Sequence, residues 1–225
     1  MKEISLDTET TGLDPKDGHK IVEIGCVEIV DKVKTGNVFH TYINPERDMP
    51  EGAFKVHGIS KEFLQDKPKF AEIAKDFVDF VKDTNLVIHN AAFDMKFINF
   101  ELRQCGMEII ERRFVKDSLT MARNKYPGAK NSLDALCKRF KIDLSRREKH
   151  GALLDADLLA DVYVELLGGN QRSLFEMKKE VKKENIITKK NIKILESRNF
   201  KILNEDEKSH IEFIKRNFKN NHWDY

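Results

Sequence analysis

Two acidic side chains near the N-terminus have a spacing that suits metal chemistry. Asp7 and Glu9 lie two residues apart in Ser5-Leu-Asp-Thr-Glu-Thr-Thr-Gly12. In an extended strand, residues i and i+2 point to the same face, about 7 Å apart, while Thr8 between them points to the other face, where we expect it to pack. Two carboxylates held this close repel each other, and a divalent cation removes the repulsion. Taken alone, the pair favours an ordinary solvated strand end, because acidic pairs are common on protein surfaces.

Two further acids and a histidine stand at the ends of predicted elements. Asp94 falls in the first turn of a helix that follows a buried strand, a position where α/β folds place their sites. Asp155 falls at the start of a later helix, five residues after His150. Acids at the ends of elements can converge, and helix N-termini add positive partial charge that favours phosphate and carboxylate groups nearby.

The elements that must position these residues follow from hydrophobic patterning. Strands are predicted over residues 2–6, 21–30, 36–43, 86–89 and 114–115, and helices over residues 70–81, 91–105, 152–167 and from Asn131 or Ser132 to Phe140. We expect the first three strands to form an antiparallel meander, and Asn90 to be the N-cap of the second helix. This order predicts an α/β domain with a mixed sheet flanked by helices.

Composition limits the class of protein. A chain of 225 residues with 40% apolar content can form one well-cored domain with an appendage. Cys26, Cys105 and Cys137 are odd in number and widely spaced, so neither a disulfide framework nor a zinc knuckle is predicted. No window reaches the length of a membrane span and no signal peptide pattern is present, so we expect a cytoplasmic protein without a membrane partner.

The charge of the chain is divided between its two parts. Residues 171–225 contain 14 Lys and Arg against 9 Asp and Glu, whereas the first 170 residues contain 26 against 29. A basic tail can serve solubility alone or bind nucleic acid or a protein partner, and the sequence leaves both open.

Three segments that carry the acids resemble a known family, in order along the chain. Leu6-Asp-Thr-Glu-Thr-Thr-Gly12, His89-Asn-Ala-Ala-Phe-Asp94 and His150-Gly-Ala-Leu-Leu-Asp-Ala156 resemble the three exonuclease motifs of the DEDDh family, and in particular its proofreading (epsilon) subunits of bacterial DNA polymerase III. Val56-His-Gly-Ile59, Asn131-Ser-Leu-Asp-Ala-Leu-Cys137 and the helix from Leu154 to Tyr163 are similar to the same subunits.

The resemblance implies a ribonuclease-H-like fold and a two-metal 3′-to-5′ exonuclease that releases nucleoside 5′-monophosphates. Carried over by motif, Asp7 would bridge two Mg²⁺ or Mn²⁺ ions, with Glu9 and Asp155 completing one site. Asp94 would support the other ion. His150 would be the general base, since imidazole titrates near neutrality; capping of the last helix or pairing with Asp155 is its alternative role.

The resemblance also implies contacts to the 3′-terminal nucleotide. His57 and His89 would line the cleft that holds it, although a structural hydrogen-bonding role is the alternative for both. Thr10, Gly12 and Phe93 would contact the terminal sugar and base, because a glycine lets backbone N–H groups approach and an aromatic ring can stack. Other acids are expected to be structural: Asp117 after a short strand, and Asp157 and Asp161 on a solvated helix face.

The chain after the catalytic domain is expected to bind partners. We predict an exonuclease domain over residues 1–169, a flexible Lys-rich linker over 170–203 and a C-terminal segment over 204–225. Gln171 to Phe175 resembles the peptide with which bacterial polymerase subunits dock on the sliding clamp; folding back of Leu174 and Phe175 onto the domain is the alternative.

The C-terminal segment has a predicted helix over residues 205–220, with Asn204 and Glu207 spaced as a capping box. Its apolar stripe contains Ile211, Ile214 and Phe218, with Trp223 beyond. The resemblance implies that this stripe binds the catalytic subunit of the replicative polymerase.

The leading hypothesis is therefore a proofreading exonuclease that acts on a DNA 3′ end, single-stranded or frayed, within a replicase. A free DEDDh exoribonuclease that trims RNA ends is one alternative. A non-catalytic module that bridges clamp and polymerase is another. The sequence also leaves open a small accessory subunit as a further partner.

Overall fold

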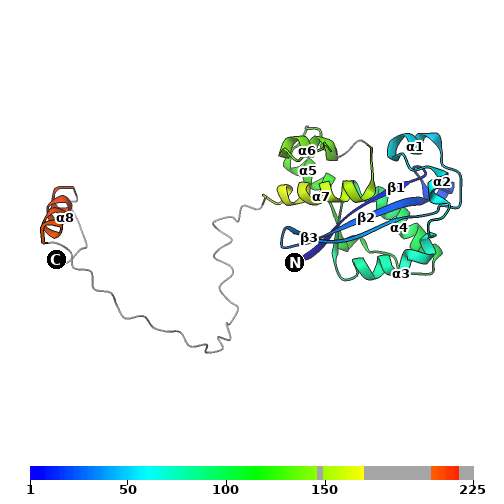
Figure 1. The fold of residues 1–225 in the computed structure, drawn as a ribbon, viewed down its shortest axis with the longest axis horizontal. Helices are drawn as coiled ribbons and strands as arrows, with labels where there is room; N and C mark the ends of the chain where they lie inside the picture. The colour runs from blue at the N-terminus through cyan, green and yellow to red at the C-terminus, as the bar shows by residue number, and fades with distance from the viewer. Residues whose placement is uncertain (146–148, 170–203, 218–225) are drawn as a thin grey trace, which may run out of the picture. The chain divides into compact units, whose positions relative to one another are not determined.

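The computed structural model describes residues 1–145, 149–169 and 204–217 (Figure 1). The chain divides into two units, residues 1–177 and residues 178–225. The predicted linker over 170–203, with its Gln171 to Phe175 peptide, lies outside the described residues, as do Phe218 and Trp223. Among the helices that are described, none has both the length and the apolar character that a bilayer span requires.

A five-stranded mixed sheet forms the centre of the first unit, in the order β3-β2-β1-β4-β5. Strands β1 (Lys2–Thr10), β2 (Ile21–Val30) and β3 (Val33–Tyr42) form an antiparallel meander. Strand β4 (Asn85–Ile88) runs parallel to β1, and β5 (Val115–Asp117) runs parallel to β4. The predicted meander and mixed sheet are thus confirmed, and the parallel strands β1 and β4 end at the same edge of the sheet.

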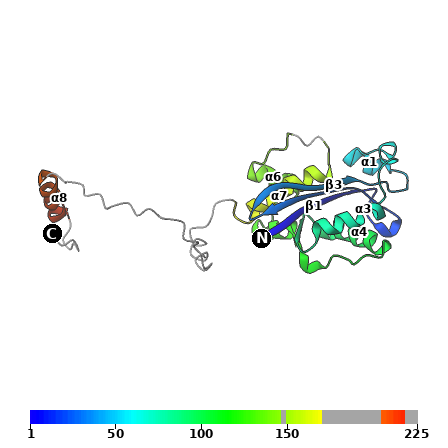
Figure 2. The ribbon, with the colours of Figure 1, turned by 60° about the horizontal axis from the view of Figure 1, so that its bottom comes forward.

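Helices α3 (Phe70–Val81) and α4 (Ala91–Gln104) cover one face of this sheet (Figure 2). Their buried residues Phe77 and Phe97 belong to one apolar core with alternate residues of β1, such as Leu6. Helix α3 has the predicted bounds, because its apolar residues recur at helical spacing.

Asn90 precedes α4 as predicted, but its side chain does not cap the helix. Its backbone has φ +67°, and no hydrogen bond joins its side chain to the first turn. The amide nitrogen of Asn90 donates instead to Asp117 Oδ1 at 3.2 Å. The start of the helix that carries Asp94 is therefore held by the neighbouring strand β5.

The opposite face of the sheet is covered by α7 (Ala152–Leu166). Residues of α7 such as Ala156 and Leu159 pack against Val27 of β2 and Val87 of β4. Two shorter helices, α5 (Ser118–Lys125) and α6 (Leu133–Phe140), pack against α7 through a further apolar cluster. Ser132 caps α6 by accepting a hydrogen bond from the amide of Ala135 at 3.3 Å, in line with one of the two caps that the sequence predicted.

Several short elements were not predicted from the sequence. They are α1 (Glu51–His57), α2 (Lys61–Leu64), α5 and the 3₁₀ turns η1 (Pro15–Asp17) and η2 (Arg112–Phe114). In the second unit, α8 (Asn204–Asn217) begins one residue before the predicted helix. Ile211 and Ile214 of α8 are half-buried, whereas Phe213 is 57% exposed.

Candidate active site

The end of β1 supplies side chains to both faces of the sheet. Residues alternate along a strand, so Leu6 and Thr8 face the side that α4 covers, while Ser5, Asp7 and Glu9 face the side that α7 covers. The two carboxylates therefore share one face of the strand, as the sequence predicted, and in the structure this is the face that α7 covers.

Asp94 reaches the same edge of the sheet from the first turn of α4. Its Oδ1 accepts hydrogen bonds from Thr8 Oγ1 at 2.7 Å and from the Thr8 amide at 3.1 Å. Thr8 is buried, as its predicted packing role requires, and its hydroxyl also binds a site carboxylate, which the sequence did not predict. Asp94 is only 3% exposed, and this burial raises its pKa to about 7, although the hydrogen bonds from Thr8 act in the opposite direction.

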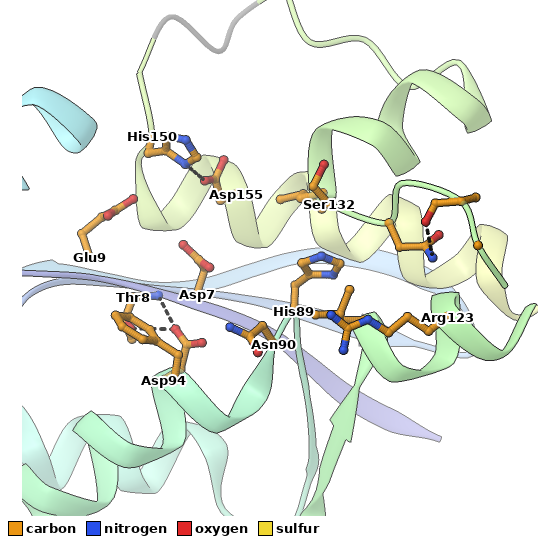
Figure 3. A pocket seen from close by; sticks show the side chains of 16 residues that line it. Asp7, Thr8, Glu9, His89, Asn90, Asp94, Arg123, Ser132, His150 and Asp155 are labelled. Atoms are coloured by element: carbon orange, nitrogen blue, oxygen red, sulfur yellow. Dashed lines mark hydrogen bonds and ion pairs between the residues drawn. The ribbon is translucent and has the colours of Figure 1, made fainter. Parts of the chain in front are cut away.

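Asp155 and His150 reach the site from the start of α7. The His150 Nδ1 lies 3.1 Å from Asp155 Oδ2 (Figure 3). Asp155 is buried, with 4% of its side chain exposed, while 49% of the His150 side chain is exposed. The pairing with Asp155 that the sequence left open for His150 is thus present, in an arrangement that leaves half of the imidazole facing solvent.

The donor atoms fit a hard divalent cation. Glu9, His150 and Asp155 each offer one ligand atom, and these three atoms all lie within 4.8 Å of one another. Asp7 lines the same cavity. Carboxylate oxygens that lie this close together are the ligands that Mg²⁺ and Mn²⁺ prefer, and a cation offsets the repulsion between the acids.

All four acids and His150 line one cavity, which has a volume of about 830 Å³. Figure 3 shows these side chains around it. His89 and Phe93 also line it, as expected for two of the predicted nucleotide contacts. The lining further includes residues to which the sequence assigned no contact: Thr8, Asn90, Leu119, Arg123, Gly128, Ala129, Asn131, Ser132 and Leu133. Arg123 is exposed and lies on α5, a helix that the sequence did not predict, so no pattern pointed to it.

The two predicted histidine contacts differ in their surroundings. His89 Nδ1 lies 2.9 Å from Ser118 Oγ, and burial lowers its pKa, with the nearby Asp117 charge opposing the shift. His57 is 6% exposed and does not line the cavity; its Nδ1 accepts a hydrogen bond from the Ile59 amide at 3.0 Å. Burial also lowers the pKa of His57.

Thr10 and Gly12 likewise do not line the cavity. Thr10 Oγ1 donates a hydrogen bond of 2.6 Å to the carbonyl oxygen of Gly12. A side chain at position 12 would overlap the ring of His19. Close packing against His19 therefore accounts for the glycine, and contacts of Thr10, Gly12 and His57 with a nucleotide remain predictions.

The acids that were expected to be structural have structural partners. Lys34 Nζ lies 2.8 Å from Asp157 and 2.9 Å from Asp161, and about 40% of each acid side chain is exposed (42% and 41%). Asp117 accepts hydrogen bonds from the amides of Leu119 and Thr120, and so caps α5.

The fold and the site together define a nuclease. The mixed sheet carries Asp7 and Glu9 at the end of β1, and Asp94 and Asp155 in the first turns of α4 and α7, all facing one cavity, an arrangement suited to metal-dependent hydrolysis of a phosphodiester. The family model described as Exonuclease matches residues 4–163. The chain belongs to this exonuclease family and, within it, to the DNA polymerase III epsilon subunits.

Curated relatives and a solved structure support this assignment. The chain is 56% identical over 191 residues to "DNA polymerase III subunit epsilon" of Rickettsia felis, covering 84% of this chain and 83% of the relative. It is 48% identical over 190 residues to the protein of the same name from Escherichia coli K12, covering 81% and 78%. The structure of exonuclease X in complex with 5′-overhanging duplex DNA matches with a TM-score of 0.59 and 25% identity, over 78% of this chain and 96% of that chain.

The predicted DEDDh exonuclease, its ribonuclease-H-like fold and its function as a 3′-to-5′ proofreading exonuclease are confirmed by these similarities. The protein is a metal-dependent 3′-to-5′ exonuclease. Its dependence on a divalent metal agrees with the carboxylate-rich donor set around Glu9 and Asp155.

Proposed function

We propose that the exonuclease reaction uses two Mg²⁺ or Mn²⁺ ions, which Asp7, Glu9, Asp94 and Asp155 would hold, and that Asp7 would serve both. The observation that carries this proposal is the convergence of the four acids from β1, α4 and α7 on one cavity. When bound, the ions neutralise charge on the attacking and leaving oxygens of the 3′-terminal phosphodiester. The product is a nucleoside 5′-monophosphate.

His150 is the general base of this proposal. Its Nδ1 faces the Asp155 carboxylate at 3.1 Å, so Nδ1 carries the ring proton and Nε2 accepts the proton of the attacking water. The half-exposed imidazole can release that proton to solvent. A direct metal ligand is the competing role, since a His150 nitrogen lies within 4.8 Å of ligand atoms of Glu9 and Asp155.

The terminal nucleotide occupies the cavity beside these groups. Phe93 and His89 line the cavity and can contact its base and sugar by stacking and hydrogen bonding. Thr10 directly follows Glu9 on the chain and Gly12 lies three residues after it, which keeps both close to a nucleotide bound at that acid. His57, which is 6% exposed, is the predicted contact that depends most on movement when substrate binds.

Amide variants test the metal assignment without changing the shape of the site. Asp7→Asn and Asp155→Asn should abolish metal-dependent release of mononucleotides and weaken Mn²⁺ binding measured by calorimetry. The matched control is Asp157→Asn, on the same helix but paired with Lys34 outside the cavity. Retained nuclease activity in either site variant, with a folded protein, would refute the assignment.

The His150 roles separate in a second pair of measurements. His150→Gln should lower kcat by about 10²–10⁴-fold, the range of a general base, while Mn²⁺ affinity stays near that of the unchanged protein. A parallel loss of Mn²⁺ affinity would instead identify His150 as a ligand.

We also propose that this proofreading exonuclease works on DNA within a replicase, bound to the polymerase, in the cytoplasm. The name shared by the relatives from Rickettsia felis and Escherichia coli supports a polymerase partner. DNA and RNA oligonucleotides with paired and mispaired 3′ ends provide the test. Faster removal from mispaired DNA is expected, and preference for RNA would favour the exoribonuclease alternative.

The proposed division of the chain assigns residues 1–169 to catalysis, 170–203 to a linker and 204–225 to the polymerase. Support for the last role comes from α8, a 14-residue helix on which Phe213 is 57% exposed. Gln171 to Phe175 is the proposed sliding-clamp peptide, and a small accessory subunit is a further candidate partner of the catalytic domain.

A pull-down with polymerase and clamp tests this division. Full-length protein should retain both partners, and a version ending at Gly169 should lose both while it keeps nuclease activity. A version ending at residue 203 should lose the polymerase alone. Polymerase binding by the shortest version would refute the role of the C-terminal segment.

A further inference from the structure

Helix α7 begins without a capping side chain of its own. Its N-cap residue is Gly151, which has extended backbone geometry (φ −157°, ψ 127°) and forms no side-chain hydrogen bond to the first turn. The first N–H groups of a helix have no partner within the helix, and a buried one left unpaired is costly. Here the amide of Ala152, the first helical residue, donates to Glu23 Oε2 of strand β2 at 3.1 Å.

Glu23 is built into the protein as a fixed group. It is 3% exposed, and its second oxygen, Oε1, lies 2.8 Å from His40 Nε2 on strand β3. Both carboxylate oxygens are therefore engaged, one by the edge strand and one by the helix. The positive partial charge at the helix N-terminus further favours a carboxylate at this place.

The position of Glu23 in the sheet brings the cap next to the metal site. Glu23 lies directly opposite Glu9 in the antiparallel register of β1 and β2. Two acids in this position repel each other. Hydrogen bonds with the Ala152 amide and with His40 offset this repulsion on the side of Glu23, and Glu9 lines the cavity. Residues opposite each other in adjacent strands share a face, which puts the start of α7 beside the site.

A glycine of the same strand fixes the distance between helix and sheet. Gly25 lies two residues after Glu23, on the same face, and a Cβ atom there would overlap the backbone of Ala152 and Leu153. The first turn of α7 thus rests directly on β2. His150 lies two residues before Ala152, and Asp155 lies three residues after it, with its amide bonded to the Gly151 carbonyl oxygen at 2.9 Å.

We propose that Glu23 is a positioning residue of the exonuclease: by holding the first turn of α7, it sets Asp155 and His150 against Asp7 and Glu9. Glu23 acts through the helix and does not touch substrate. The proposal rests on the roles proposed above for His150 and Asp155. Its importance for rate follows from geometry, because a displacement of about 1 Å in reacting groups can cost about 10²-fold in rate.

Two substitutions at Glu23 separate capping from charge. Glu23→Ala removes the cap and should lower kcat at least tenfold, with KM for a DNA oligonucleotide changed less than threefold. Glu23→Gln keeps an oxygen for the Ala152 amide and an NH₂ group for His40, so kcat should stay within threefold of the unchanged protein. Amide hydrogen exchange of Ala152, measured without metal, should speed up in Glu23→Ala and not in Glu23→Gln.

A matched control accounts for general loss of stability. Glu3 is another buried acid with two partners, Lys116 and Tyr163, at the opposite end of β1. Glu3→Ala should lower stability without changing kcat per folded molecule or exchange at Ala152. If Glu23→Ala does not fold, adding Gly151→Ser supplies a local cap in a position where a Cβ atom meets nothing within 4 Å, and should recover fold and activity.

The kcat values and the hydrogen exchange of the Glu23 variants together decide whether Glu23 positions the site. An unchanged kcat in folded Glu23→Ala would overturn the proposal, as would equal losses in Glu23→Ala and Glu23→Gln, which would point to charge and not to capping. Faster exchange at Ala152 with unchanged kcat would show that the cap exists but that the proposed roles of His150 and Asp155 do not depend on it. Activity that survives His150→Gln and Asp155→Asn would refute those roles while leaving the exchange result intact.

Discussion

Thr8 donates two hydrogen bonds to one oxygen of Asp94, through its hydroxyl at 2.7 Å and its amide at 3.1 Å. The contact joins β1 to the first turn of α4, 86 residues further along the chain. The contact orients Asp94. Burial raises the pKa of Asp94 to about 7, whereas the hydrogen bonds from Thr8 act in the opposite direction and favour the charged form that a cation needs. Thr8, which lies between Asp7 and Glu9 in the sequence, thus supports a further acid of the site, Asp94.

Removal of this hydroxyl should damage both stability and function. Thr8→Val keeps the shape of the side chain but leaves Asp94 with one donor fewer, which should cost about 1–3 kcal/mol of unfolding free energy in urea. Loss of a group that orients a metal ligand should also lower activity about 10–100-fold. Thr8→Ser, which keeps the hydroxyl, is the control and should behave nearly as the unchanged protein. Equal behaviour of the Val and Ser variants would show that the hydroxyl is unimportant.

Close packing at Gly25 gives a prediction about the sheet. Gly25→Ala would place a methyl group into the backbone of Ala152 and Leu153, so α7 must shift or the strand must bend. We expect a loss of about 1–3 kcal/mol in unfolding free energy, together with reduced nuclease activity. Gly52→Ala is the control, because position 52 lies in α1 and has no atom within 4 Å of the added methyl. It should leave stability unchanged or raise it, by at most about 1 kcal/mol.

The pattern of apolar residues was sufficient to predict the main layers of the fold. Alternation in β1 to β3 and helical spacing in α3 report which face is buried, and burial is what forms these elements. The helices α1, α2 and α5 were missed. They have four to eight residues, too few for a hydrophobic stripe to stand out, and buried residues such as Leu64 of α2 and Ala122 of α5 pack against distant parts of the chain.

The same distinction holds for the site. Asp7, Glu9, Asp94, His150 and Asp155 were found because they fall in motifs and at the ends of strongly patterned elements. Glu23 and Thr8 were missed as supporting residues, since their roles depend on hydrogen bonds to residues 129 and 86 positions away. Such pairings are set by strand register and helix docking, which local sequence does not reveal.

The buried His57 and the half-buried His89 should make stability depend on pH. Burial lowers the pKa of His57 and of His89 below the usual value of 6.5, so the unfolded chain binds protons more readily than the folded one. This contribution to stability is present above pH 6.5 and is lost as pH falls through the lower pKa values of the folded state.

The variant His57→Asn isolates this effect. Its amide oxygen can accept the hydrogen bond from the Ile59 amide in place of Nδ1, but the side chain does not titrate. Between pH 6.5 and 5, the unfolding free energy of the unchanged protein should fall more steeply, by about 1 kcal/mol per pH unit or less. Urea denaturation at several pH values measures both slopes, and parallel slopes would contradict the role of His57. Asp94 titrates in both proteins, so its contribution cancels in the difference.

The spacing of Asp7 and Glu9 should matter as much as their charge. One alanine inserted between Thr8 and Glu9 would move Asp7 to the face of α4, because successive residues of a strand alternate. If the strand instead kept the register of its buried residues Ile4 and Leu6, the extra residue would form a bulge beside the acids. In either case Asp7 and Glu9 no longer lie at their present spacing on the face that α7 covers. Mononucleotide release should then fall as far as in Asp7→Asn. An alanine inserted between Glu46 and Arg47, in a loop outside the sheet and the cavity, is the control and should leave activity within a few-fold. Activity in the strand insertion that matched this control would show that the spacing is not required.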